Sequence, residues 1–356
     1  MMRDELLSPS KSDEDVEQID ELDSEGLRPT RLSDFVGRSE LKHHLEIILG
    51  AAKKRKKPPD HLLFAGPPGL GKTTLANIVS HEMGVKLHST SGPALERAGD
   101  LAAILTKLEP GDVLFIDEIH RLSKAVEEVL YPAMEDYQLD IVLGKGPAAR
   151  SVRLAVAPFT LVAATTRTGL ITGPLRDRFG LVARLEYYDA SELNSIVLRS
   201  AGIFDIPIEE AGSKEISLRA RGTPRIANRL LRRVRDYAEM ETEGVIDEST
   251  AKEGLRIFGI DQLGLDKVDR AILQALCKQF TGGPVGLSTL AISVSEPTET
   301  VEDVYEPFLI QQGLLMRTPR GRVATAKAWK HLDLDPPSQS GLGKENSPSL
   351  LTELDK

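Results

Sequence analysis

Short apolar runs alternate with helix-like stretches over residues 28–186. The runs that are apolar enough to be buried strands are residues 61–65, 113–116, 160–164 and 181–186. Buried strands separated by helices are typical of a parallel sheet with helices on both faces. We therefore expect an α/β fold for this part of the chain.

The apolar pattern changes after residue 186. In residues 187–258 the spacing of Ile226, Leu230, Leu231 and Val234 follows the helical period, which predicts a small helical domain. Residues 259–331 predict three helices, followed by an alternating, turn-containing stretch. We interpret this last region as a winged-helix module. The helices are expected at residues 266–280, 288–292 and 301–313, and the hairpin at 314–325.

Composition supports two or three domains, because the chain has 356 residues and 40% of them are hydrophobic. The net charge of −9 is uneven: residues 1–27 hold ten acidic and two basic residues, and residues 332–356 hold five and two. We expect both ends to be disordered tails. The sequence has no membrane-length apolar run or secretory signal, so we expect a cytoplasmic protein with no membrane partner. The single Cys277 excludes a disulfide scaffold and is expected in a core.

The first apolar run leads directly into the glycine-rich segment Gly66-Pro-Pro-Gly-Leu-Gly-Lys-Thr73, which fits G-x-x-x-x-G-K-[ST]. Glycines such as Gly69 and Gly71 allow backbone N–H groups to surround an anion, and the next helix presents its positive end. Lys72 is placed to reach the β- and γ-phosphates, and the Thr73 hydroxyl can ligate Mg²⁺. The segment predicts an ATP and Mg²⁺ site.

The second strand candidate, residues 113–116, ends in Asp117 and Glu118. Alone, this is most often an ordinary strand end. Beside a phosphate loop, however, Asp117 can hold the Mg²⁺ shell and Glu118 can polarise the attacking water. The two motifs together predict an ATPase.

Several less common strings make the chain resemble the AAA+ ATPases and, within them, the RuvB family. The resemblance spans residues 28–331 and implies an AAA+ P-loop domain, a small helical lid domain and a C-terminal winged-helix domain. It also implies an ATP-driven motor that translocates duplex DNA to migrate Holliday junctions in recombination and repair. The strings are GPPGLGKTTLA, DEIHRL, YPAMEDY, GPAARSVRL, ATTRTGLITGPLRDRFG, GTPRIANRLLRRVRDYA and GLLMRTPRGR.

The resemblance also implies catalytic roles outside the two motifs. Arg176 and Arg178 are both candidates for an arginine finger that completes the site of a neighbouring subunit, and the resemblance assigns this role to Arg178. Without the family pattern, a surface salt bridge would be the favoured interpretation of such an arginine. Thr166 matches the first sensor and Arg225 the second, where Pro224 fixes the helix start. The other nucleotide contacts implied are Leu27, Arg28, Thr74, Glu135, Asp136, Tyr137 and Tyr188.

Residues 139–156 read as a protruding hairpin with Gly144, Gly146 and Pro147 at its tip. Apolar arms of this kind are commonly ordinary sheet packing. In the RuvB family, however, this hairpin docks on RuvA, which implies a partner surface. Its residues are Ile141, Val142, Val152 and Leu154. The segment 154–158 departs from the more acidic, proline-richer family pattern.

Residues 307–331 contain no acid. Such a basic cluster is commonly a solvated edge, but the resemblance implies a DNA-binding wing that contacts phosphates through Arg317 and Arg322, with Arg320 a lesser candidate. The basic residues are Arg317, Arg320, Arg322, Lys327 and Lys330. A second basic cluster on the helix that starts near Pro224 is expected to be mainly an interface or solvated face, Arg225 excepted.

The implied partners are double-stranded DNA and four-way junctions, RuvA, RuvC in a resolvase complex, and further copies of the chain in a ring, expected to be a hexamer. One alternative is a nucleotide-switched AAA+ DNA-binding protein of the replication-initiator kind, which the phosphate-type wing and the hairpin disfavour. Another is an AAA+ unfoldase, which would need an aromatic pore loop. The sequence shows no convincing loop of that kind between the two nucleotide motifs.

Overall fold

The computed structural model describes residues 26–143 and 150–336. It divides into two compact units, Met1–Phe258 and Gly259–Lys356. The predicted tails lie almost entirely outside the described residues, as do Gly144, Gly146 and Pro147 of the predicted hairpin tip. The described helices include none that is both long and apolar enough to cross a membrane.

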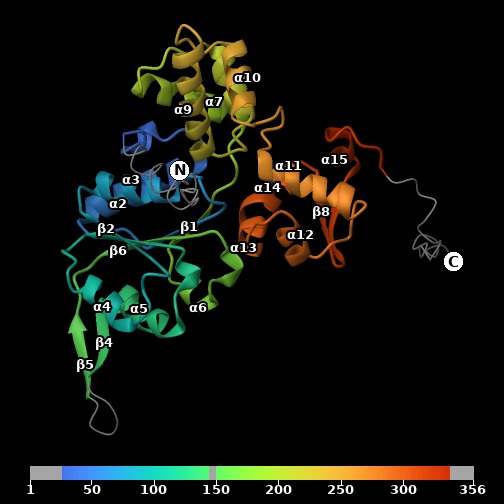
Figure 1. Ribbon diagram of the computed structural model, residues 1–356. Helices are drawn as coiled ribbons and strands as arrows, with labels where there is room; N and C mark the ends of the chain where they lie inside the picture. The colour runs from blue at the N-terminus through green and yellow to red at the C-terminus, as the bar shows by residue number, and fades with distance from the viewer. Residues whose placement is uncertain (1–25, 144–149, 337–356) are drawn as a thin grey trace, which may run out of the picture. The chain divides into compact units, whose positions relative to one another are not determined.

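A five-stranded parallel sheet forms the centre of the first unit, in the order β2-β3-β6-β1-β7 (Figure 1). This confirms the predicted sheet and its four strands, with β7 two residues shorter than expected at its end. The strand β2 was not predicted, because it lies at the sheet edge and its LHSTS sequence is only partly buried. The strands are β1 (Leu62–Ala65), β2 (Leu87–Ser91), β3 (Val113–Asp117), β6 (Thr160–Thr165) and β7 (Leu181–Arg184).

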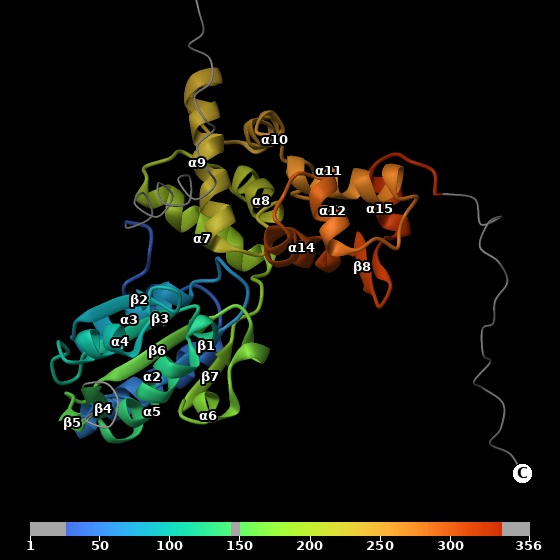
Figure 2. The ribbon, with the colours of Figure 1, turned by 60° about the horizontal axis from the view of Figure 1, so that its bottom comes forward.

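Helices cover both faces of this sheet (Figures 1 and 2). Helices α2 and α3 lie on one face, and α4 and α5 on the other, where Leu114 and Phe159 belong to a core with Leu101 and Leu130. This arrangement gives the sheet the two apolar faces that its sequence predicts. The helices are α2 (Ser39–Arg55), α3 (Lys72–Met83), α4 (Ala98–Leu105), α5 (Lys124–Asp136) and the short α6 (Gly173–Arg176).

The predicted hairpin is present as the antiparallel pair β4 (Gln138–Leu143) and β5 (Arg150–Ala155). Its register places Ile141 opposite Val152 and Leu139 opposite Leu154. Within residues 154–158, which depart from the family pattern, the Val156 N–H donates to the Tyr137 carbonyl oxygen at 2.8 Å. The pairing therefore extends to the base of the hairpin.

Four helices form the lid region that follows β7. In α9, small and apolar residues such as Ala227, Leu230 and Val234 are buried, while the arginines of the helix occupy positions that are not buried. This amphipathic pattern is the one that the sequence predicted. The helices are α7 (Ala190–Ile203), α8 (Glu210–Leu218), α9 (Pro224–Glu241) and α10 (Glu248–Ile257).

The second unit has the predicted winged-helix arrangement, in which helices precede a β-hairpin. Cys277 lies in its core, as expected, and burial raises the pKa of its thiol to about 11. A helix after the hairpin, α15, was not predicted; it contributes the buried Trp329. The elements are α11 (Lys267–Gln274), α12 (Leu287–Ser293), α13 (Thr298–Thr300), α14 (Glu306–Gln311), β8 (Leu315–Thr318), β9 (Gly321–Ala324) and α15 (Ala326–His331), with π-helical turns at Ala275–Gln279 and Val301–Tyr305.

Candidate functional site

The phosphate loop joins the carboxyl end of β1 to the amino end of α3. Two of its glycines are required by backbone geometry. Gly66 has φ of 152°, and a Cβ there would lie 2.4 Å from the Leu185 carbonyl oxygen; Gly71 has φ of 91° and begins α3. Any other residue would strain the loop at these positions. The loop therefore brings its backbone N–H groups and the positive end of α3 to one point.

Lys72 is held inside this loop. Its ammonium group donates to the carbonyl oxygens of Gly66 at 2.8 Å and Pro67 at 2.9 Å, and the residue is buried. Burial lowers the pKa of Lys72, while the charges of Asp117 and Glu118 oppose that shift. The two acidic side chains therefore lie close enough to Lys72 to oppose the effect of burial on its pKa.

The acid pair lies at the carboxyl end of β3. The Glu118 backbone is left-handed, with φ of 48°, and its N–H donates to Asp117 Oδ1 at 2.8 Å. The Thr166 hydroxyl donates to Glu118 Oε2 at 3.1 Å, and the His120 ring nitrogen Nδ1 lies 3.1 Å from the same oxygen. Thr166 therefore contacts the predicted water-polarising carboxylate directly, at the end of the neighbouring strand β6.

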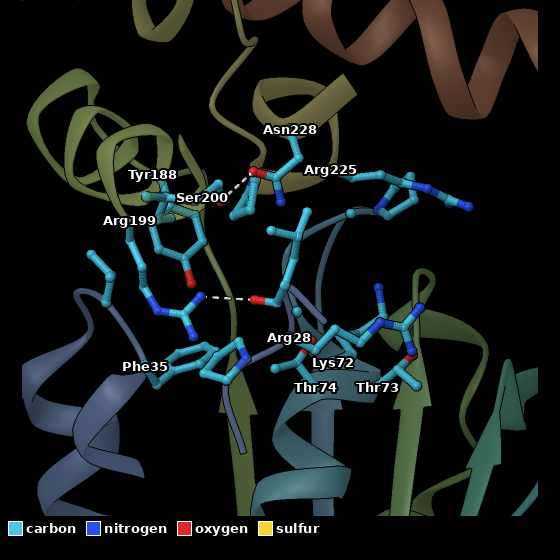
Figure 3. Close-up of a pocket in the computed structure, with 18 of the residues that line it drawn as sticks. Arg28, Phe35, Lys72, Thr73, Thr74, Tyr188, Arg199, Ser200, Arg225 and Asn228 are labelled. Atoms are coloured by element: carbon cyan, nitrogen blue, oxygen red, sulfur yellow. Dashed lines mark hydrogen bonds between the residues drawn. The ribbon is translucent and has the colours of Figure 1, made fainter. Parts of the chain in front are cut away.

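A cavity of about 300 Å³ lies beside the loop, between the sheet domain and the lid helices (Figure 3). It brings together most of the residues that the sequence analysis selected. In addition, Arg225 packs on the loop, since a Cβ at Gly69 would lie 3.2 Å from the Cβ of Arg225. The selected residues that line the cavity are Leu27, Arg28, Gly69, Gly71, Lys72, Thr73, Thr74, Asp117, Glu118, Tyr188 and Arg225.

Several cavity residues were not selected from the sequence. The guanidinium of Arg199, on α7, donates to the Leu27 carbonyl oxygen at 2.8 Å and so fixes the segment before the sheet domain (Figure 3). The Ser200 hydroxyl donates to the Asn228 amide oxygen at 2.8 Å, which joins α7 to α9. No sequence motif marks these residues, because packing of the lid brings them to the cavity. The unselected residues include Phe35, Ile196, Arg199, Ser200, Asn228 and Arg232.

Arg232 is a cavity residue that the sequence did not mark. We expected the arginines of α9, Arg225 excepted, to be mainly an interface or a solvated face, but Arg232 lines the cavity two turns after Arg225. A spacing of seven residues returns a helix to nearly the same face. This spacing is the signal that could have identified Arg232.

Five selected residues do not line the cavity of their own chain. Thr166 is one, and it acts on the site through Glu118. Arg178 pairs instead with Glu135, with 2.9 Å between Nη2 and Oε1. Asp136 and Tyr137 follow at the carboxyl end of α5. Their roles as nucleotide contacts stay predictions, which require a neighbouring subunit.

In the winged-helix unit, a buried carboxylate binds the two arginines selected for DNA contact. Glu306 Oε1 accepts from Arg317 Nε at 2.8 Å, and Oε2 accepts from Arg322 Nη2 at 2.9 Å. The Arg322 side chain is only 14% exposed, and that of Glu306 only 1%. Arg320 is exposed and has no ion-pair partner within the part of the chain that the structure describes. Arg320 is therefore exposed and the Arg317 side chain is half-exposed, whereas Arg322 is mostly covered and paired with Glu306.

We expect the ion pairs of Glu306 with Arg317 and Arg322 to stabilise the winged-helix unit. Glu306→Gln should lower the free energy of unfolding of the winged-helix unit by about 3 kcal/mol, because it leaves buried arginine charge without its counter-ion. The single tryptophan of the chain, Trp329, lies in this unit, so its fluorescence in a urea titration reports the loss. Glu302→Gln is the matched control, since Glu302 is partly exposed and its ion pair with Arg317 lies near the surface. Equal stability of the two variants would contradict the prediction.

The effect should also depend on pH. Burial raises the pKa of Glu306, but the hydrogen bonds from Arg317 and Arg322 outweigh it, so the pKa is lowered overall. A carboxyl whose pKa is lower in the folded state contributes stability above its unfolded pKa, about 4.3, and loses that contribution as the pH falls through its folded pKa. The difference between wild type and Glu306→Gln should therefore be full at neutral pH and shrink below about pH 4.

Of the selected hairpin residues, the side chains of Val152 and Leu154 are described. Leu154 is exposed, and Val152 is partly exposed on the same strand, two residues away. Residues separated by two lie on one face of a strand. Ile141 and Val142 are paired in the hairpin, but their side chains lie outside the described parts of the structure. A partner surface at this hairpin stays a prediction.

Comparison with known proteins finds matches to three family models along the chain. Residues 27–185 match the model of the Holliday junction DNA helicase RuvB P-loop domain, residues 188–261 the RuvB AAA lid domain, and residues 262–333 the RuvB C-terminal winged helix domain. The Holliday junction branch migration complex subunit RuvB of Parafrankia sp. (strain EAN1pec) is 58% identical over 326 residues, or 92% of each chain.

The chain is also similar to solved structures. The RuvB Holliday junction branch migration motor of Thermotoga maritima is 48% identical, with a TM-score of 0.80, over 88% of this chain and 100% of that chain. A variant of the T. maritima protein gives a TM-score of 0.81 at 49% identity, over 87% of this chain and 99% of that chain. The similarity therefore includes both the sequence and the arrangement of the elements.

Proposed function

The chain belongs to the RuvB family of Holliday junction branch migration motors, and we propose that its cavity hydrolyses ATP to move duplex DNA through a four-way junction. The observation that carries this proposal is the cavity itself, which unites the phosphate loop, the acid pair and the lid arginine Arg225. A nucleotide held there contacts both the sheet domain and the lid. Its hydrolysis can therefore change the angle between them.

We assign the chemical roles from this geometry. Lys72 neutralises the β- and γ-phosphates, because its ammonium group already lies within the loop. Glu118 orients and polarises the attacking water, and Thr166 holds the carboxylate through Oε2. Arg225 senses the γ-phosphate from the lid.

The residues present also fit a magnesium ion. The Thr73 hydroxyl and the Asp117 carboxylate both line the cavity, and both are the hard oxygen ligands that Mg²⁺ prefers. Mg²⁺ usually keeps several waters and binds through one or two protein ligands together with substrate phosphates. When bound, Mg²⁺ would neutralise charge on the phosphates.

We propose that Arg178 acts in trans, in a ring of several copies, which we take to be a hexamer. Its position outside its own cavity supports this role, as does its pairing with Glu135. The exposed hairpin residue Leu154 supports docking of RuvA. RuvC in a resolvase complex and a cytoplasmic location are further parts of the proposal, which follow from the family alone. An initiator-type DNA-binding protein is not favoured.

A branch migration assay tests the proposal. A synthetic four-way junction with labelled arms is incubated with the protein, ATP and Mg²⁺, with and without RuvA. We expect ATP-dependent dissociation into two duplexes, and stimulation by RuvA. ATP consumption that leaves the junction intact in the presence of RuvA would contradict the proposed activity.

The wing makes a separate prediction about DNA. Arg317→Ala combined with Arg320→Ala should weaken duplex binding and reduce the slope of log K against log salt by about 2, since two phosphate contacts are lost. The substitutions leave Arg322 paired with Glu306, so the fold retains its buried ion pair. Fluorescence anisotropy across a salt series measures the slope. Arg317→Lys combined with Arg320→Lys is the control that keeps the charge, and an unchanged slope in the alanine variant would place the DNA surface elsewhere.

A further inference from the structure

Three contacts fix the guanidinium of Arg178. It lies over the Tyr131 ring, with 4.3 Å between its central carbon and the ring centroid. Nη2 pairs with Glu135 at 2.9 Å, and Nη1 donates to the Pro174 carbonyl oxygen at 2.5 Å. Nε is buried and has no hydrogen-bond partner in the described parts of the chain. The ring face is therefore the contact that orients the guanidinium plane without using an N–H donor.

The Tyr131 ring is itself fixed. Its hydroxyl donates to Glu127 Oε1 at 2.6 Å and lies 3.3 Å from the Thr172 hydroxyl. Glu127 is buried and also accepts a hydrogen bond from Thr172. Thr172 caps α6, the helix that ends at Arg176, two residues before Arg178. One network thus fixes both the aromatic face and the start of the segment that carries Arg178.

We propose that Tyr131 is a positioning residue for the Arg178 finger. Its ring holds the guanidinium plane without using an N–H donor, so that Nη2, which pairs with Glu135 in the single chain, can turn to a phosphate of the neighbouring subunit. Glu135 is the counter-ion that this phosphate replaces. The inference deepens the proposed function, on which it rests, by naming the group that orients the finger.

Substitutions of Tyr131 separate the ring from the hydroxyl. Tyr131→Leu removes the aromatic face and should lower kcat for ATP about tenfold, with little change in KM, because the nucleotide cavity of each protomer is intact. Tyr131→Phe keeps the face and should keep more than half of the activity. The measurements are steady-state ATPase kinetics, binding of a fluorescent ADP, and the temperature of unfolding. A wild-type kcat in Tyr131→Leu, or an equal loss in both variants, would overturn the proposal.

A mixing experiment tests whether the effect acts across the subunit interface. Tyr131→Leu protomers have an intact site and a misplaced finger, whereas Glu118→Gln protomers have a disabled site and an intact finger. Mixed rings contain interfaces in which an intact site faces an intact finger, so the mixture should hydrolyse ATP at least twofold faster than the mean of the two separate variants. Absence of recovery would place the effect of Tyr131 in its own site and overturn the inference.

A second mixture of variants distinguishes failure of the Tyr131 positioning role from failure of the Arg178 finger role. Arg178→Ala mixed with Glu118→Gln should recover activity in the same way if Arg178 is a finger in trans. When this second mixture recovers and the Tyr131→Leu mixture does not, only the positioning role fails. When Arg178→Ala alone hydrolyses ATP at the wild-type rate, the proposed function of Arg178 fails, and the positioning role fails with it.

Discussion

Arg178→Ala should lower ATP turnover by about 10³-fold while nucleotide binding stays close to that of the wild type. A finger supplied in trans is worth about 10³ to 10⁵ in rate, because it neutralises charge that develops on the transferred phosphoryl group. Binding persists since Arg178 does not line the cavity of its own chain. ATPase kinetics and fluorescent ADP binding measure the two effects separately.

The matched control is Arg176→Ala. Arg176 is an exposed arginine at the end of α6, two residues earlier, and it has no ion-pair partner in the described residues. Its loss should change turnover less than threefold. If Arg176→Ala abolished turnover while Arg178→Ala did not, the finger would be Arg176, and the pairing of Arg178 with Glu135 would be only a surface ion pair.

The centre of the site could be predicted because its residues are close in sequence or end successive strands. Gly66 to Thr73 form one loop, and the Asp117–Glu118 pair follows a run whose burial its apolar sequence predicts. Parallel strands bring their carboxyl ends to one edge of the sheet. The chemistry at that edge therefore follows from the sequence.

The rim of the site could not be predicted in this way. Arg199 and Asn228 lie on lid helices whose exposed faces carry many polar residues, and only the packing of the lid selects the ones that reach the cavity. The strand β2 was missed because an edge strand needs little apolar sequence. These elements depend on tertiary contacts that no local pattern records.

In the winged-helix unit, tertiary contacts also decide which basic residues are exposed, and the local sequence does not show this. Along the chain, Arg317 and Arg322 appear as equal members of a basic cluster without nearby acids. In the fold, the buried Glu306, more than ten residues earlier, binds both and leaves Arg322 mostly covered. Charge counted within a window therefore overestimated the free basic surface.

Glu118→Gln should separate binding of ATP from its hydrolysis. The amide has nearly the shape of the carboxylate and can still accept the hydrogen bond from Thr166, which is 3.1 Å long in the structure. It cannot accept a proton from water, however, and general-base catalysis contributes about 10² to 10⁴ in rate. We expect turnover to fall at least 100-fold, with the ATP affinity changed less than threefold.

We expect this loss of turnover without loss of ATP affinity for Glu118 and not for the neighbouring Asp117. Asp117 receives the Glu118 N–H and lies beside the loop, where it affects the phosphates and an ion, so Asp117→Asn should weaken Mg²⁺-dependent binding as well as turnover. Glu109→Gln, at an exposed ion pair with Lys86, is the control for loss of a carboxylate alone. Titration with fluorescent ATP and single-turnover hydrolysis distinguish the three variants. If Glu118→Gln hydrolysed ATP at the full rate, another group would have to act as the general base. His120, whose Nδ1 lies 3.1 Å from Glu118 Oε2, would then be the candidate.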